Sequence, residues 1–515
     1  MKAINNNIWK SILFVALGFT ALASCSEDAM DRINEDNDHT KSVPAKFVLA
    51  DAITSTAFNN IGGDLNTYFS VYTEHTVGVD NQLYKAESRN GEPSVSSTFN
   101  NVWGNLYSTL RDARIVVLKA SDEVGANYTT KGIGEVLVAI NSALITDAFG
   151  NTPYSQASLP ELENGRPKFM NPDIDAQEAI YQSVMKYLDD AIVDLPKGDK
   201  KDKVGGYDFI YQGDGAKWLK LAYGLKARYT MRLLARSKDR EADLRKVLEY
   251  IDKSYKSRDE QAAFSIYDDN NWNPFFAFFY AREALAASKS YWDKLVERKD
   301  PRLHRIFCDA KGAQIKGADD KALLMAPNGT ADGIKNHYNT PVFVYSISCP
   351  TLLMSYHELL FLKAEALARL GKTAEAEAAL KEAVVAAIAN AEMGLKSAVD
   401  YGLETSSEAI TEKEAGEYFD ANVKPLFTAN PLREVMIQKY LAMLGAFGES
   451  TECYNDIRRM KALNEDFIKL DNPKPFPLRA PYGSSDVLAN PKVQEAYGDG
   501  QYVYNTPVWW AGGNR

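Results

Sequence analysis

Along most of the chain, apolar residues recur at the three- and four-residue spacing of an α-helix. In the segment 100–121 they fall at Val102, Leu106, Leu110, Ala113 and Val117. The same spacing continues through 134–150, 175–195 and 215–237, with turns rich in Gly, Pro and Asn between these segments. Strict alternation of apolar and polar residues is scarce, and 340–348 is the best short candidate for a strand. The pattern predicts a mostly α protein with long irregular loops.

One segment carries a more specific signal. Residues 355–392 read as a helix, a turn at Gly371 and a second helix. Small and large residues follow the spacing of a tetratricopeptide repeat at Ala364, Leu367, Gly371, Ala376 and Leu380. An ordinary antiparallel helix pair is the simpler alternative. Helix pairs near 100–147 and 176–236 are candidates for degenerate copies. Because repeat proteins present extended surfaces to partners, this segment favours recognition over catalysis.

The first residues predict export. Lys2 and Lys10 precede the apolar run 12–23, which is too short to span a bilayer and is typical of a signal peptide over 1–24. "LASC" at 22–25 resembles the lipobox of bacterial lipoproteins, which implies that Cys25 is acylated and becomes the first residue. The alternative is an ordinary secretory signal with a nearby cysteine. The acids that follow resemble an export tag of Bacteroidetes surface lipoproteins, and 25–40 is predicted to be an acidic tether.

Composition narrows the function further. The chain has 515 residues and a formal net charge of −10, which argues against nucleic acid as a partner because phosphate binding requires a basic face. It contains no phosphate-binding GxxxxGK[ST] or GxGxxG motif, no GxSxG nucleophile elbow and no HExxH zinc motif. No later segment is expected to be long and apolar enough for a transmembrane helix. The sequence therefore predicts no catalytic residue, no metal site and no cofactor.

Besides Cys25, the chain contains three cysteines, Cys308, Cys349 and Cys453. Exported proteins tolerate disulfides, and three thiols allow one pair at most. Cys308 and Cys349 flank a loop-like stretch, so a Cys308–Cys349 disulfide is the predicted pair. No CxxC motif or Cys/His cluster indicates zinc.

Two arginine-containing motifs are interpreted as structural. In "DPRL" at 300–303, Asp300 is expected to cap a helix that begins at Pro301, and Arg302 and Arg305 to pair with acids. "YNDIRRM" at 454–460 is expected to be a buried helix with paired arginines rather than an anion site.

Aromatic residues supply the best candidates for a binding site. The densest cluster is the segment 272–292, where turn-forming Asn and Asp residues precede eight aromatic side chains. Rings with polar handles suit ligands that have flat apolar faces edged with hydroxyls. Some of these rings must belong to the core. The predicted ligand-binding residues in this segment are Trp272, Phe275, Tyr280, Tyr291 and Trp292.

Two polar loops are further candidates. The loop 76–93 contains an isolated tyrosine among groups that bond hydroxyls, and the candidate residues there are Asp80, Asn81, Tyr84 and Arg89. The loop 335–341 adds Tyr338.

Six sequence blocks in fixed order resemble the SusD/RagB family of Bacteroidetes outer-membrane lipoproteins, and most closely its starch-binding, outer-membrane-associated branch. The blocks lie at 142–157, 211–233, 297–307, 355–371, 436–460 and 477–497. The resemblance implies one SusD-like α-helical domain over 41–515 with four tetratricopeptide-like units. It also implies a lid on a SusC-like TonB-dependent transporter that captures nutrient, usually a glycan, at the cell surface.

The preferred interpretation is a lipid-anchored outer-membrane protein that faces the cell exterior, binds an oligosaccharide without catalysis and delivers it to that transporter. The alternative within the same architecture is peptide binding, as on the RagB side of the family. Two less favoured interpretations belong to different classes of protein: a surface glycoside hydrolase, and a scaffold that binds no ligand.

Overall fold

The computed structural model of this chain describes residues 43–91, 98–121, 126–163, 165–317 and 323–514. Residues 45–515 form one compact unit. The predicted signal peptide (1–24), the acylation site Cys25 and the tether (25–40) lie outside the described residues, so these assignments stay predictions.

Helices build most of the unit, which confirms the mostly α prediction. The first half contains α3 (Ala45–Ser55), the π-helix η1 (Thr56–Ile61), α4 (Asp64–Tyr72), α5 (Asn81–Ser88), α6 (Asn100–Ala120), α7 (Tyr128–Phe149), α8 (Gln177–Asp194), the 3₁₀-helices η2 (Leu195–Lys197) and η3 (Gly205–Tyr207), α9 (Gly215–Arg232), the 3₁₀-helix η4 (Leu233–Arg236) and α10 (Arg240–Asp252). The second half contains the 3₁₀-helix η5 (Arg258–Glu260), α11 (Pro274–Arg282), α12 (Lys289–Glu297), the 3₁₀-helices η6 (Pro301–His304) and η7 (Val342–Tyr345), α13 (Tyr356–Arg369), α14 (Thr373–Asp400), α15 (Glu412–Tyr418), the π-helix η8 (Phe419–Val423), α16 (Lys424–Ala429), α17 (Pro431–Ala442), α18 (Ser450–Ala462), α19 (Ser484–Ala489), α20 (Pro491–Tyr497), α21 (Tyr502–Asn505) and the 3₁₀-helix η9 (Trp509–Ala511).

The strands are short and pair in twos, all antiparallel. The pairs are β1 (Thr76–Gly78) with β7 (Leu285–Ala287), β2 (Thr152–Pro153) with β5 (Ile174–Asp175), β3 (Leu162–Glu163) with β4 (Arg166–Pro167), β6 (Ala262–Phe264) with β10 (Thr351–Met354), and β8 (Phe307–Cys308) with β9 (Thr340–Pro341). The strand expected over 340–348 is wrong beyond Pro341, because the chain turns there into η7.

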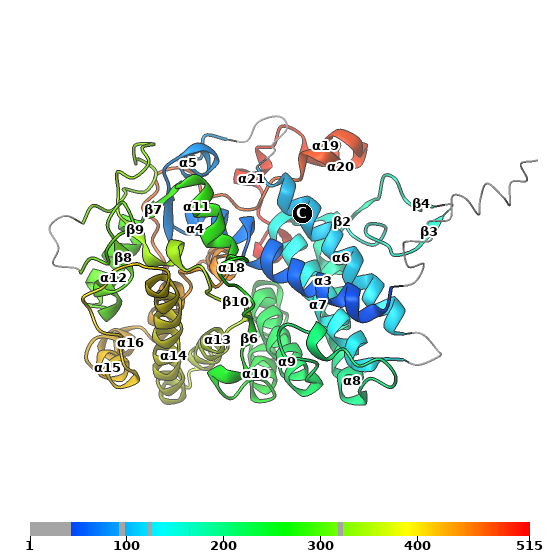
Figure 1. The fold of residues 1–515 in the computed structure, drawn as a ribbon, viewed down its shortest axis with the longest axis horizontal. Coiled ribbons are helices and arrows are strands. Elements are labelled where there is room, and N and C mark those ends of the chain that lie inside the picture. The colour runs from blue at the N-terminus through cyan, green and yellow to red at the C-terminus, as the bar shows by residue number, and fades with distance from the viewer. Residues whose placement is uncertain (1–42, 92–97, 122–125, 164, 318–322, 515) are drawn as a thin grey trace, which may run out of the picture. The chain divides into compact units, whose positions relative to one another are not determined.

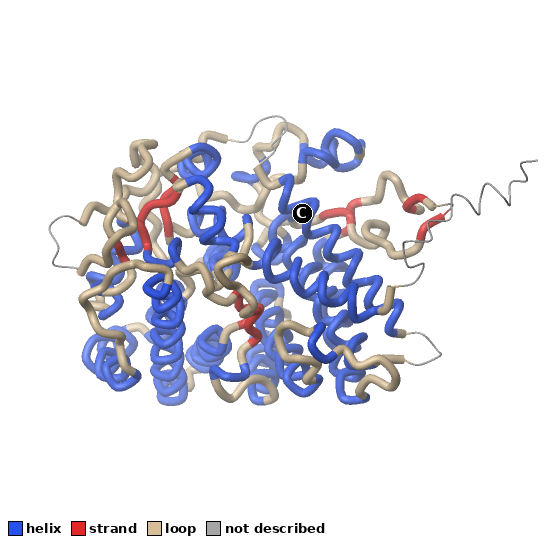
Figure 2. Tube along the Cα trace, in the orientation of Figure 1, coloured by secondary structure: helices blue, strands red, loops and turns tan. Residues whose placement is uncertain are grey.

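Antiparallel helix pairs form the framework. α6 packs on α7, α7 on α8, α9 on α10, and α13 on α14. In Figure 1 the axes of α8, α9, α10, α13 and α14 are roughly aligned, whatever the direction of the chain. Figure 2 shows the strands above or between these helices, with long loops joining them. The helix pair expected over 355–392 is present as α13 and α14, although α14 continues to Asp400. Small residues allow close packing: a Cβ on Gly134 of α7 would lie 2.9 Å from Val116 of α6.

Helix α7 lies at the centre of the unit. By length and composition, it is the one helix of the described residues apolar enough to cross a membrane, contrary to the expectation from the sequence. Its most apolar stretch is entirely buried inside the protein. Such a helix is typical of the core of a large helical protein, where no face meets water.

Buried ion pairs cross-link the helices and confirm the interpretation of both arginine motifs. Arg459 of α18 is fully buried and donates to Glu365 of α13 and to Asp456. Asp300 caps η6 by accepting from the Arg302 backbone N–H at 3.0 Å, and its carboxylate also pairs with the Arg302 guanidinium. A charge buried without a partner is strongly destabilising, so each of these arginines requires its acid.

The predicted Cys308–Cys349 disulfide is wrong. Cys308, Cys349 and Cys453 are free and buried. Cys308 and Cys349 belong to different hydrophobic clusters, and the Cys308 thiol lies 3.0 Å from the Thr340 hydroxyl. Burial raises the pKa of each of the three thiols, so they stay protonated and unreactive.

Candidate functional site

The aromatic segment forms helix α11, which Asn273 anchors at its start. The Asn273 side-chain oxygen accepts from the Phe275 and Phe276 backbone N–H groups, and Pro274 occupies the first helical position. The buried Asn273 amide also donates to the carbonyl oxygens of Cys349, at 2.7 Å, and Ala446, at 2.9 Å. The turn-forming residues before the rings therefore fix α11 rigidly to the core.

One face of α11 carries a chain of contacting rings. Phe276 and Tyr280, one turn apart, stack with centroids 5.7 Å apart and planes at 27°. Trp272 packs edge-on against both, and Tyr401, which follows α14, packs edge-on against Phe276 with centroids 5.1 Å apart. Phe276 is buried, whereas Tyr280 is 60% exposed and Tyr401 is 45% exposed. The exposed tyrosines are thus held in place by a buried ring between them.

Three of these rings, Phe276, Tyr280 and Tyr401, border a cavity of about 790 Å³, here called the aromatic hollow; Trp272 is not among its lining residues. It is lined by Phe276, Phe279, Tyr280, Glu283, Lys311, Gly312, Asn336, Tyr345, Tyr401, Gly402 and Leu403. The lining comes from α11, from the loop after β8, from the loop before β9, from η7 and from the turn after α14. A cavity of this size suits a ligand of several rings.

Several polar groups of the aromatic hollow are uncommitted. Among the described residues, none hydrogen-bonds to the hydroxyl of Tyr280 or Tyr401, and none pairs with the Lys311 ammonium. The Asn336 amide donates to Glu283 at 3.3 Å, which links the loop before β9 to the end of α11. The aromatic hollow therefore presents ring faces together with free donors and acceptors.

Gly312 gives the hollow its shape on one side. It has a φ of +68°, and a Cβ at this position would lie 2.1 Å from the Tyr345 ring. Only glycine fits both conditions without displacing backbone or ring. Burial raises the pKa of Tyr345, with a smaller contribution from the nearby Cys308 thiol, so the phenol stays neutral at the floor.

The three candidate segments of the sequence meet in space. β1 pairs with β7, directly after α11, so α5 lies beside this region, as Figure 1 shows. Tyr84 of α5 packs against Gly333, and Asp80 pairs with Lys335 at 3.2 Å. Asn81 is exposed in the first turn of α5. Helix α5, which carries Tyr84, and the loop of Tyr338 therefore meet beside the aromatic hollow, although Asp80, Asn81 and Tyr84 are not among the residues that line it.

Buried contacts also hold α5 in place. The Glu87 carboxylate accepts from the Gly329 backbone N–H and from the Asn472 amide. Burial raises the pKa of Glu87 to about 7, an effect that the Gly329 contact and the nearby Arg89 oppose. The carboxyl thus ties α5 to two loops that are distant in the sequence.

Four of the predicted binding residues belong to the core, which corrects the prediction from the sequence. Phe275 and Tyr291 are buried, and the Tyr291 hydroxyl donates to the Leu441 carbonyl at 2.7 Å. Arg89 is buried, donates to the Tyr72 carbonyl and lies over the Phe476 ring. Tyr338 is buried in a small cluster with Val77 and Ala286.

A fifth predicted residue, Trp292, is half-buried. It packs edge-on against Phe307, 5.1 Å away, and is not among the residues that line the hollow. Its contact is with the core of the unit rather than with the cavity.

The sequence interpretation missed most of the polar lining. Tyr401, Glu283, Lys311 and Asn336 were not predicted as binding residues. Tyr401 lies at the end of a long helix that was interpreted only as part of a repeat. The "DYGLE" turn at 400–404, which places an aromatic residue before a glycine, is the one local signal that singles it out.

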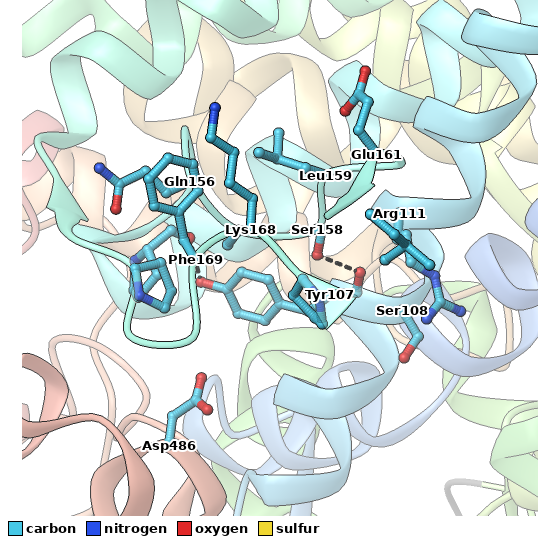
Figure 3. A pocket seen from close by; sticks show the side chains of 15 residues that line it. Tyr107, Ser108, Arg111, Gln156, Ser158, Leu159, Glu161, Lys168, Phe169 and Asp486 are labelled. Carbon is cyan, nitrogen blue, oxygen red and sulfur yellow. Dashed lines mark hydrogen bonds between the residues drawn. The ribbon is translucent and has the colours of Figure 1, made fainter. Parts of the chain in front are cut away.

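Another cavity, of about 320 Å³, is a weaker candidate (Figure 3). Several of its polar groups already make internal hydrogen bonds. The Tyr107 hydroxyl donates to the Pro153 carbonyl at 2.7 Å, and the Ser158 hydroxyl donates to the Tyr107 carbonyl. Asp486 accepts from the Trp103 indole. This cavity is smaller than the aromatic hollow, and three of its polar side chains are committed to internal hydrogen bonds, so the aromatic hollow is the better site.

Packed helix pairs that carry an open cavity bordered by exposed aromatic rings are typical of a binding protein built from helical repeats. A family model described as SusD-like, "Starch-binding associating with outer membrane", matches residues 36–482. The chain therefore belongs to the SusD-like family, and the resemblance to SusD/RagB proteins is confirmed.

Solved structures agree with this membership. A SusD/RagB family protein from Bacteroides thetaiotaomicron VPI-5482 is 54% identical, with a TM-score of 0.86 over 92% of this chain and 100% of that chain. A chitin-binding protein (20% identity, TM-score 0.67, 91% and 99% covered) and a SusD homolog from Bacteroides fragilis NCTC 9343 (18%, 0.68, 91% and 99%) share the fold. A search of curated proteins gave no match.

Proposed function

We propose that this protein binds an oligosaccharide at the cell surface and passes it to a SusC-like TonB-dependent transporter. The observation that carries the proposal is the pair of exposed tyrosines, Tyr280 and Tyr401, on either side of the buried Phe276 ring. Their ring faces and uncommitted hydroxyls match the flat apolar faces and the hydroxyl edges of sugars. Starch oligosaccharides are the first ligands to test, since the family is described as starch-binding.

The composition of the hollow favours binding without hydrolysis. Retaining and inverting glycosidases use two carboxyl groups that flank the scissile bond. Glu283 is the one acidic residue among the described residues that line the hollow, and its carboxylate already accepts from Asn336. A neutral sugar can bind there, whereas the second carboxylate that hydrolysis requires is not among the described residues of the lining.

The family and the sequence support the proposed cellular location. The family associates with the outer membrane. In this proposal Cys25 carries the lipid anchor, the acidic tether leads to the domain, and the hollow faces the cell exterior. A protein tied to the membrane near its partner gains a high effective concentration, which favours transfer of ligand to the transporter.

Binding is tested with the soluble chain that starts at Ser26. A panel of linear starch, chitin and other polysaccharide fragments is titrated by calorimetry, with a peptide mixture as the alternative ligand. We expect saturable binding of at least one glycan and none of the peptides. Binding of peptides alone would show that the ligand class is wrong, and reducing sugar released from a bound glycan would show that the protein is an enzyme.

The anchor gives a separate prediction. Replacing Cys25 with alanine removes the acylated thiol, so we expect the protein to move from the membrane fraction to the soluble fraction, while the affinity of the purified soluble form stays unchanged. Fractionation followed by immunoblotting measures the first effect and calorimetry the second. Replacing Ser26 with alanine, one residue away, is the matched control and is expected to stay membrane-bound. Retention of the Cys25→Ala protein in the membrane would contradict the anchor.

A further inference from the structure

The opposite face of α11 lines a second cavity, of about 480 Å³, here called the amide pocket. Its walls come from α11, from η1 and the turn that leads into α4, from the first residue of α4, and from the first turns of α6. The lining residues are Phe58, Asn59, Gly63, Asp64, Asn101, Asn105, Pro274, Ala277, Phe278 and Arg282. Helix α11 is thus shared by two cavities, one on each side.

The floor of the amide pocket is apolar. Pro274 and Phe278 are buried, and Phe58 is half-buried. The Arg282 guanidinium lies 4.6 Å from the Phe278 ring centroid, a cation–π contact that holds the arginine at the rim. The pocket therefore offers an apolar surface with a fixed donor beside it.

The rim is built from amides that make no internal contact. Within the described part of the chain, no side chain hydrogen-bonds to those of Asn59, Asn101 or Asn105. Neighbouring amides that point inward behave differently: Asn60 donates to Asn141 at 2.8 Å, and Asn66 accepts from the Ser450 backbone N–H. Among these neighbouring amides of the described residues, the ones without a hydrogen bond are those that line the pocket. An amide both donates and accepts, as a sugar hydroxyl does, so several converging amides suit adjacent hydroxyls.

The charges at the rim select against an ionic ligand. Asp64 and Arg282 contribute one negative and one positive charge. Burial raises the pKa of Asp64, and the nearby Arg282 opposes that rise. With one charge of each sign, neither an anion nor a cation is favoured over a neutral, hydroxyl-rich molecule.

We propose that the amide pocket is a second saccharide subsite, which binds another part of the oligosaccharide chain held in the aromatic hollow. The inference rests on the proposed function. Glu283 and Tyr280 lie on the hollow side at the end of α11, and Arg282 lies on the pocket side. A helix is roughly 10–12 Å across, so a chain of several sugars can pass over this end and occupy both sites.

The test compares ligands of different length with the soluble chain that starts at Ser26. The probes are maltose, maltotriose and maltoheptaose, or chitooligosaccharides of matching lengths if the panel selects chitin. The variant replaces Asn101 and Asn105 with alanine, both exposed on α6, where alanine preserves the helix. We expect its affinity for maltoheptaose to fall about tenfold, and its affinity for maltose and maltotriose to stay unchanged.

Two controls separate the outcomes. Gln182→Ala removes an exposed amide from α8, away from both cavities, and should change nothing. Tyr280→Ala should weaken the binding of every probe. If Tyr280→Ala weakens binding while the double asparagine variant binds maltoheptaose normally, the subsite is wrong and the proposed function stands. Equal losses for short and long probes would also contradict a separate subsite. If no glycan of the panel binds the unaltered protein, both proposals fail.

Discussion

Replacing Arg459 with methionine is expected to lower the free energy of unfolding by about 3–5 kcal/mol, the usual penalty for breaking a buried ion pair from one side. Arg459 is fully buried. Its guanidinium donates to both carboxylate oxygens of Glu365, at 2.5 and 2.8 Å, and to Asp456 at 2.9 Å. Methionine fills a similar volume, so the loss reports mainly on two buried carboxylates that no longer contact the Arg459 guanidinium.

The loss should depend on pH. Burial alone would raise the pKa of Glu365, but the Arg459 and Arg369 guanidiniums hold it well below its usual range. The ionised carboxylate therefore stabilises the native protein above its unfolded pKa, and this contribution is lost as the pH falls. Without Arg459, fewer positive charges oppose the effect of burial, so the pKa of Glu365 rises. The difference between the two proteins should accordingly be largest near pH 7 and shrink in acid.

Urea unfolding followed by circular dichroism, at neutral and at mildly acidic pH, measures both effects. The matched control is Arg245→Met, which breaks an exposed ion pair with Glu241 on the surface of α10. That control should cost about 0.5 kcal/mol or less. A loss for Arg459→Met as small as that of the control would show that the buried cluster does not stabilise the fold.

The second large effect concerns the ligand. The double variant Tyr280→Ala, Tyr401→Ala is expected to lower glycan affinity about 100-fold, from roughly tenfold for each ring, or about 1.4 kcal/mol each. Both rings contact Phe276, so the two losses can differ from strict additivity. The phenylalanine versions keep the rings and remove the hydroxyls, and they should retain most of the affinity if stacking dominates.

Calorimetry with the best glycan of the panel measures the change. Tyr207→Ala is the matched control, because Tyr207 is exposed at 37% and lies on η3, outside the lining of the hollow. Circular dichroism confirms that each variant is folded. Unaltered affinity of the double variant would exclude the aromatic hollow as the binding site.

The helical framework was predictable because apolar periodicity reports which side of a helix is buried. The pair α13 and α14 and the buried Arg459 followed from local spacing. The aromatic segment was harder, since Phe275, Phe276, Phe278 and Phe279 leave no polar face to set the phase of α11. The sequence therefore located the cluster, including Trp272 and Tyr280, but misassigned Phe275 and Tyr291 to the surface.

Residues that meet only through tertiary packing could not be predicted. Tyr401 reaches Phe276 because α14 ends beside α11, a juxtaposition of segments more than a hundred residues apart. The disulfide prediction was wrong for a related reason. Cys308 and Cys349 flank one loop in the sequence, but the fold places their side chains in separate hydrophobic clusters. The local sequence pattern predicts individual helices and strands. Which of them lie side by side is known only once the fold is determined.

The anchoring of α11 by Asn273 has a thermodynamic consequence. The Asn273 amide hydrogen-bonds the start of the helix to two carbonyl groups of the core. The buried Phe276 ring packs against both exposed tyrosines, Tyr280 and Tyr401. Little rotamer freedom remains for a ligand to remove, so the entropic cost of ordering the site is largely met during folding. Most of the conformational entropy lost on binding should therefore belong to the oligosaccharide, and stiffer glycans should bind more tightly than flexible ones of equal length.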